Sequence, residues 1–171
     1  MPYSATSDEH TLPDWWCHLA CRLTFLPQTG TVRTSLALGQ SMFTPQDIKV
    51  TELIPNDRPY AGWLYFTGGF VIEDSAMRDL HTVELTLGAV GPQSYADETQ
   101  IRWHELIGAP RPSGWSHQLK NEPGVVIAYE RKRRYPWSTG SAWLPEIDLT
   151  PHGAVNLGNV YTHAGGGLTG R

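Results

Sequence analysis

Cysteine is nearly absent from this chain, and the few cysteines present build no framework. Of the 171 residues only Cys17 and Cys21 are cysteines, so neither a disulfide set nor a two-pair zinc pattern can form. Their i, i+4 spacing favours packing as small apolar residues. The sequence also lacks a His-x-x-x-His spacing, a Gly-x-Ser-x-Gly motif and a phosphate-binding loop. These absences argue against a zinc site, a nucleophile-elbow hydrolase and a nucleotide-binding protein.

Positive charge and long apolar runs are also scarce. The formal net charge of −4 gives no case for a nucleic-acid partner. The one basic run, Arg-Lys-Arg-Arg at 131–134, is interpreted first as a solvated strand end and second as an anchor for anionic head groups. No apolar run approaches the roughly 20 residues of a membrane helix. The first ten residues have neither the basic nor the apolar stretch of a secretory signal.

Glycine, proline and tryptophan are plentiful instead. The chain has 17 glycines, 13 prolines and seven tryptophans, a mixture typical of a β-rich protein with many turns. Its length predicts a single domain over residues 1–171.

The order of apolar residues predicts one early helix followed by strands. Residues 1–10 are expected to be unstructured, and 12–26 have helical periodicity. From residue 31 onward apolar residues alternate with small or polar ones, which predicts strands. These are expected within 31–42, 61–72, 81–91 and 125–130, with one or two more in 146–171. The pattern fits an all-β antiparallel outer-membrane barrel and a soluble sandwich about equally well.

Two long loops, 44–59 and 91–123, separate the predicted strands, and the second contains a predicted helix over 100–108. In this helix Gln100 and His104 share one face, while Trp103 and Ile107 form an apolar stripe on a neighbouring face. His104 is a candidate general base, although a hydrogen-bonded structural histidine is the default interpretation.

Four ordered blocks of sequence resemble a known family, the outer-membrane lipid A deacylases (lipid A 3′-O-deacylases). They are Leu-Ala-Leu-Gly-Gln-Ser-Met-Phe-Thr-Pro-Gln-Asp-Ile at 36–48, Asn-Asp-Arg-Pro-Tyr-Ala-Gly-Trp-Leu-Tyr at 56–65, Leu-Gly-Ala-Val-Gly-Pro at 87–92, and 100–104 continuing into 111–123. The resemblance covers about 12–171. It implies a closed antiparallel barrel of about a dozen strands in the outer membrane of a Gram-negative bacterium.

The implied activity is hydrolysis of the 3′ acyloxyacyl ester of lipid A. The implied partners are lipopolysaccharide and the lipids of the outer membrane. In this family a histidine activates water, and calcium and a lysine are thought to stabilise the oxyanion. The chemistry is consistent, because imidazole exchanges protons near neutral pH and a divalent cation stabilises a tetrahedral intermediate.

The resemblance also suggests site residues. His104 matches the family's histidine, Gln100 is expected to support its orientation, and Lys49 is the nearest match to the lysine. We expect Trp103 and Trp115 to contact the substrate.

The chain also departs from the family pattern. The Asn-Asp pair of the family's first strand and the Tyr-Thr of its second have no match, and nothing in the first ten residues corresponds to the family. The calcium ligands therefore remain unidentified, as does the oligomeric state. With about half the family's strands, the chain is expected to be a fragment of such a barrel. Two alternatives stay open: a catalytically incomplete barrel fragment, and a soluble carbohydrate-binding β-sandwich.

Overall fold

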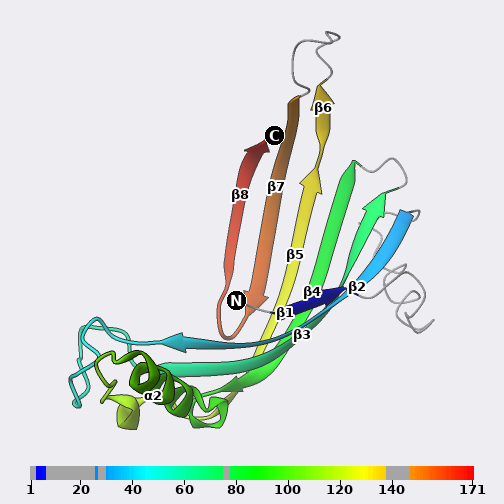
Figure 1. The fold of residues 1–171 in the computed structure, drawn as a ribbon. Coiled ribbons are helices and arrows are strands. Elements are labelled where there is room, and N and C mark those ends of the chain that lie inside the picture. The colour runs from blue at the N-terminus through cyan, green and yellow to red at the C-terminus, as the bar shows by residue number, and fades with distance from the viewer. Residues whose placement is uncertain (1–2, 7–25, 27–29, 75–77, 138–146) are drawn as a thin grey trace. The chain divides into compact units, whose positions relative to one another are not determined.

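The structure is a computed structural model that describes residues 3–6, 26, 30–74, 78–137 and 147–171. The helix predicted over 12–26 lies outside the described residues except for Leu26, as do both cysteines. The described elements, in chain order (Figure 1), are β1 (Tyr3–Thr6), β2 (Gly30–Phe43), β3 (Ala61–Asp74), β4 (Asp79–Val90), η1 (Pro92–Ser94), α2 (Ala96–Ile107), η2 (Trp115–His117), β5 (Glu122–Arg133), β6 (Tyr135–Trp137), β7 (Ile147–Gly158) and β8 (His163–Gly170). No helix among the described residues is long and apolar enough to cross a membrane.

The strands form one sheet in the order β1-β2-β3-β4-β5-β7-β6, and β8 pairs with β7. The sheet is mostly antiparallel, as predicted, and it is open over the described residues. β5 and β6 share one register on β7, with Lys132 opposite His152 and Tyr135 opposite Leu149. The described strands thus belong to a single sheet, whereas the sandwich alternative needs two sheets packed face to face.

The chain divides into two compact units. The first consists of Met1–Tyr3, Ala37–Phe66 and Thr86–Val125, and the second of Ser4–Leu36, Thr67–Leu85 and Val126–Arg171. The single domain expected from length stays a prediction.

Alternation of apolar residues predicted the long strands well, and it missed the first one. β2 extends the predicted 31–42 by one residue at each end, and β3 extends 61–72 by two. The expectation that residues 1–10 are unstructured is wrong for Tyr3–Thr6, which forms β1 next to β2. A four-residue strand gains its order from pairing with a neighbour, which the sequence of the segment alone does not reveal.

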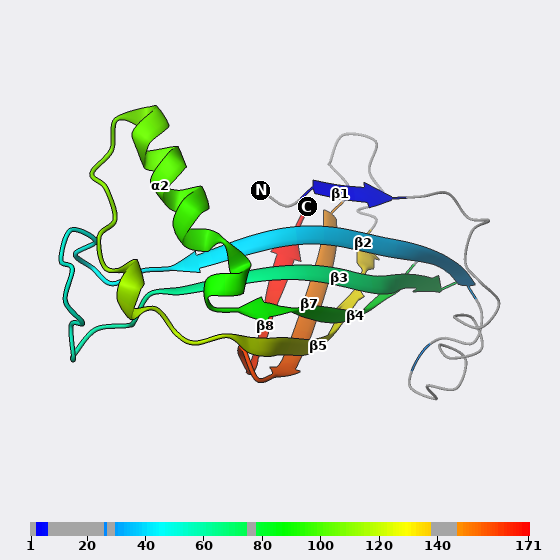
Figure 2. The same ribbon diagram turned by 90° about the horizontal axis from the view of Figure 1, so that it is seen from below.

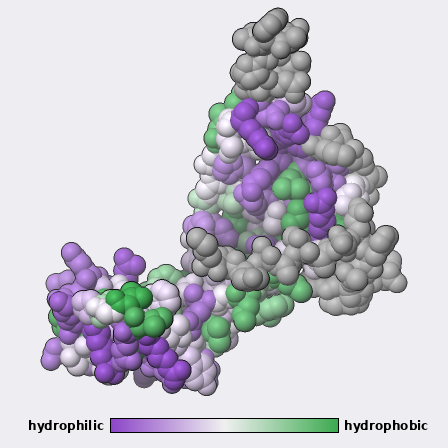
Figure 3. All heavy atoms as spheres, in the orientation of Figure 1, coloured by the Kyte–Doolittle hydropathy of each residue, from purple (hydrophilic) through white to green (hydrophobic). Residues whose placement is uncertain are grey.

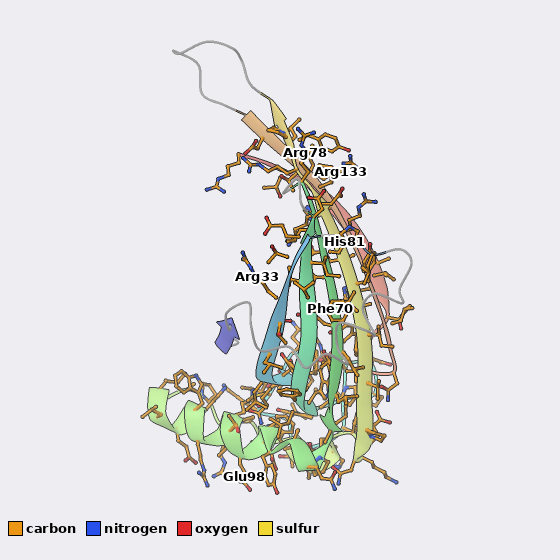
Figure 4. All side chains as sticks on the ribbon, turned by 90° about the vertical axis from the view of Figure 1, so that its right-hand side faces the viewer. Arg33, Phe70, Arg78, His81, Glu98 and Arg133 are labelled. Atoms are coloured by element: carbon orange, nitrogen blue, oxygen red, sulfur yellow. The ribbon has the colours of Figure 1, made fainter. Side chains whose placement is uncertain are left out.

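Each unit has its own small core. In the second unit Leu26, Phe70 and Ile72 are buried against Val32, Val83 and Tyr129, and Figure 4 labels Phe70 on β3. In the first unit Tyr60, Ala96 and Trp115 are buried against Met42 and Ile48. This second cluster joins the long loops and α2 to the sheet. In Figure 2, α2 lies at the end of the sheet where β2 ends and β3 begins.

Candidate active site

The helix that carries the candidate histidine begins earlier than the sequence analysis predicted. α2 starts at Ala96, four residues before Gln100, and it ends at Ile107. Asp97 and Glu98 lie in its first turn, where negative charge suits the positive end of the helix dipole. Tyr95 precedes the helix in a left-handed conformation (φ 53°) without a side-chain cap, so the usual N-cap signal is missing.

The start of α2 is fixed to the beginning of β3. Ala96 is only 1% exposed and Ser94 is fully buried. A Cβ at Gly62 would collide with the Ser94 hydroxyl oxygen and the Ala96 methyl group, so this close approach requires glycine. The Gly91 N–H donates to the Gly62 carbonyl (2.9 Å), and the Gln40 side-chain amide donates to the Ser94 carbonyl (2.5 Å). These contacts set the height and direction of the helix.

A cavity of about 610 Å³ lies along α2. Its lining residues are Met42, Thr99, Gln100, Arg102, Trp103, His104 and Leu106. The structure therefore brings together three of the five predicted site residues, namely Gln100, Trp103 and His104. Trp103 is 59% exposed and Ile107 55%, so the predicted apolar stripe is largely accessible to solvent. In Figure 3 apolar residues adjoin hydrophilic ones over the surface formed by α2 and the neighbouring loop.

The ring of His104 is held by a backbone carbonyl. Its Nδ1 lies 2.6 Å from the Pro110 oxygen. A carbonyl oxygen can only accept a hydrogen bond, so Nδ1 carries the proton and donates it. In the neutral imidazole, Nε2 then has a free lone pair, which is the form that a general base needs.

Gln100 is tied to the core of the first unit. Its side-chain oxygen accepts a hydrogen bond from the indole N–H of Trp115 at 2.9 Å. Trp115 is 5% exposed and packs on Tyr60 with ring centroids 4.8 Å apart. The Tyr60 hydroxyl donates to the Ile48 carbonyl (2.9 Å). Burial raises the pKa of the Tyr60 phenol, which keeps this donor protonated. Trp115 is thus hydrogen-bonded to Gln100 but is not itself among the residues that line the cavity.

Lys49 lies in the loop between β2 and β3, apart from the residues that line the cavity. Its side chain is exposed, and its backbone N–H donates to an Asp47 carboxylate oxygen at 2.9 Å. Lys49 is not among the residues that line the cavity, so its assignment stays a prediction.

Five groups at the site are not among the predicted site residues: the lining residues Met42, Thr99, Arg102 and Leu106, and the carbonyl of Pro110. Arg102 and Leu106 are four residues apart, so they share a helix face as Gln100 and His104 do. The same spacing could therefore have indicated these two residues from the sequence. The Pro110 carbonyl has no such signal, because it depends on the turn that follows the helix.

The residues around the cavity do not make a calcium site by themselves. Calcium takes six to eight oxygen ligands, usually including carboxylates. The lining residues include no carboxylate, and among the described residues no group of three or more His, Cys, Asp or Glu side chains could hold a metal ion. The calcium implied by the resemblance stays a prediction.

Comparison with known proteins gives a family and a fold. The family model described as "Outer membrane protein LpxR" matches residues 2–171. The expectation that nothing in the first ten residues corresponds to the family is therefore wrong from residue 2 onward. Among solved structures, LpxR from Salmonella typhimurium has the same fold, with a TM-score of 0.72 and 16% sequence identity. The alignment covers 99% of this chain and 62% of that one. No curated protein matches.

Proposed function

Because this chain belongs to the LpxR family of outer membrane proteins, we propose that it carries the active site of a lipid A deacylase in the bacterial outer membrane. The reaction is hydrolysis of the 3′ acyloxyacyl ester of lipid A. The partners are lipopolysaccharide and the surrounding outer-membrane lipids. The observation that supports this proposal most directly is the cavity in which His104 stands among apolar side chains.

His104 acts as the general base. Nδ1 donates to the Pro110 carbonyl, so Nε2 is available to take a proton from water. The water oxygen attacks the ester carbonyl carbon, and the proton passes to Nε2. When the tetrahedral intermediate collapses, the bond from the carbonyl carbon to the sugar oxygen breaks. His104 returns the proton to that oxygen, which leaves a sugar hydroxyl and a free fatty acid.

The walls of the cavity suit an acylated substrate. Met42, Trp103 and Leu106 line it, and Leu106 is 77% exposed. Exposed apolar side chains beside a base favour a ligand with hydrocarbon chains, because burying those chains removes apolar surface from water.

Gln100, Trp115 and Lys49 are proposed to assist His104. Gln100, held by Trp115, fixes the wall of the cavity one helical turn from His104. Lys49, on the loop between β2 and β3, is the candidate for stabilising the oxyanion. Calcium would supply further positive charge there if ligands outside the described residues hold it.

The test is the mass of lipid A from a Gram-negative host that lacks its own deacylase. The chain is directed to the outer membrane, and lipid A is extracted and analysed by mass spectrometry. We expect a loss of mass equal to the acyloxyacyl group, and His104→Ala should abolish it. Removing a general base typically costs about 10²–10⁴-fold in rate.

The matched control is His117→Ala, which removes an exposed histidine of η2 whose Nδ1 lies 3.1 Å from the Ser116 hydroxyl. This variant should retain deacylation. Unchanged lipid A from folded wild-type protein would reject the deacylase proposal and favour the catalytically incomplete alternative. Full activity of His104→Ala would reject the general-base assignment.

A further inference from the structure

The charged side chains of α2 divide by sign around the cavity. Asp97, Glu98 and Glu105 are on the helix, yet none of them lines the cavity. Arg102 does line it, and it is the only described lining residue with a permanent charge. The cavity thus presents one cation together with His104 and an apolar wall.

The Arg102 guanidinium is not committed to a strong partner. It lies 3.8 Å from a Glu98 carboxylate oxygen, and the two side chains are 80% and 60% exposed. Exposed pairs of this kind contribute little, because water and salt screen them. Figure 4 labels Glu98 on α2. A ligand anion that offers two oxygens in one plane would be a better partner for guanidinium than this single contact.

Arg102 and His104 line the same cavity, so an anion bound by Arg102 would lie near the ester on which His104 acts. Residues two apart on a helix are separated by about 3 Å along its axis and by about 200° around it, so Arg102 and His104 do not share one helix face. Both Arg102 and His104 nevertheless border the same cavity, so the long arginine side chain can reach a group next to the ester that His104 serves. In lipid A, the sugar carbon next to the one that bears the 3′ ester carries a phosphate.

We propose that Arg102 binds this neighbouring phosphate and so makes the enzyme selective for phosphorylated substrate. The inference rests on the proposed function, since it names the group of the substrate that the same cavity recognises. A phosphate held there would align the ester with Nε2 of His104 and leave the acyl chains on Met42, Trp103 and Leu106.

The kinetic test compares lipid A that carries this phosphate with the form that lacks it, both in detergent micelles. For each enzyme variant, kcat and KM are measured on both substrates. We expect the wild type to prefer the phosphorylated form, and Arg102→Ala to lower the ratio of the two kcat/KM values by about tenfold or more. Arg102→Lys should recover part of the ratio, because it restores charge without the planar fork. Glu98→Ala is the matched control, since it removes the partner of Arg102 and should leave the preference intact.

A binding test separates this inference from the proposed function. His104→Ala protein, with and without Arg102→Ala, is titrated with the two forms of lipid A by calorimetry. The single variant should bind the phosphorylated form about tenfold more tightly, and the double variant should lose this difference. Circular dichroism confirms that the helix persists in each variant. If the wild type cleaves neither substrate, the deacylase proposal fails while the titration still decides the role of Arg102. If proteins with and without Arg102 preferred phosphorylated over unphosphorylated lipid A to the same extent, the inference would be overturned.

Discussion

The carbonyl that orients His104 is delivered by the turn that ends α2. Gly108 adopts φ 68°, a left-handed conformation that glycine enters without steric cost. The Ala109 N–H then donates to the His104 carbonyl at 2.9 Å, and the chain after the turn brings the Pro110 oxygen within hydrogen-bond distance of Nδ1 of His104. The Gly-Ala-Pro sequence after the helix is thus part of the site.

We predict that the neutral His104 side chain is in the Nδ1–H tautomer. The measurement is the pair of side-chain ¹⁵N chemical shifts in histidine-labelled protein in detergent micelles. Gly108→Ala should disturb this tautomer, because a Cβ at positive φ costs roughly 1–2 kcal/mol and loosens the turn. The effect on deacylation should follow the loss of the Nδ1–H signal.

Gly165→Ala is the matched control for this substitution. A Cβ would meet nothing within 4 Å at either glycine, but the φ angle of Gly165 is not in the left-handed range. Gly165→Ala should leave the His104 shifts unchanged. An Nε2–H signal in the wild type would contradict the assignment of Nε2 as the base.

The conformation of the loop at residues 44–60, between β2 and β3, depends on the carboxylate of Asp57. Asp57 accepts hydrogen bonds from the backbone N–H groups of Gln46 (2.6 Å) and Arg58 (2.7 Å). The Ile48 carbonyl accepts two further hydrogen bonds, from the Tyr60 hydroxyl and the Ser113 N–H. Lys49 follows Ile48 directly, so these bonds decide where its ammonium group can reach.

We predict that acid loosens this loop. The Gln46 N–H, and then the Arg58 N–H and the positive charge of Arg58, lower the pKa of Asp57. A lowered folded-state pKa stabilises the loop above the ordinary aspartate pKa, and this stabilisation is lost as the pH falls through the lowered value. Hydrogen exchange of the Gln46 amide should show protection that falls below about pH 4, after correction for the intrinsic exchange rate.

Asp57→Asn should reduce this protection at neutral pH and make it nearly independent of pH. Glu52→Gln, at an exposed position of the same loop, is the control and should behave as the wild type. Protection that stays constant down to pH 2 would show that the Asp57 carboxylate does not hold the loop.

The elements also show what the sequence could and could not predict. β2 and β3 were predictable because their alternation of apolar and polar residues is local. The four sequence blocks were enough for the family, because they preserve order and spacing as well as residue types. The start of α2 was predicted too late, because Tyr95 offers no capping side chain. The contacts of His104 with Pro110 and of Gln100 with Trp115 depend on how the loops pack, which residue spacing does not encode.

For the molecule as a whole, the exposed apolar residues of the strands are the dominant feature. In the first unit Leu38, Phe66 and Leu87 are 66%, 50% and 47% exposed. In the second, Ile127 and Leu157 are 55% and 57% exposed and lie opposite each other in the register of β5 and β7. The residues on either side of Leu38, Leu87 and Leu157 in the sequence are small or polar. Such surfaces are costly in water and are expected of strands that face lipid.

We therefore predict that a charge is tolerated unequally at two neighbouring positions of β7. Leu157→Arg should reduce the folded, vesicle-bound fraction of the protein, because arginine on a lipid-facing position costs roughly 2–4 kcal/mol near the middle of the bilayer. Asn156→Arg places the same side chain on the other face of the strand, where Asn156 contacts His163, and should cost much less. The measurement is the amount of protein that floats with lipid vesicles and keeps its strand signal in circular dichroism. Equal losses for the two variants would show that β7 does not present one face to lipid, and the membrane part of the proposed function would then need another surface of the chain.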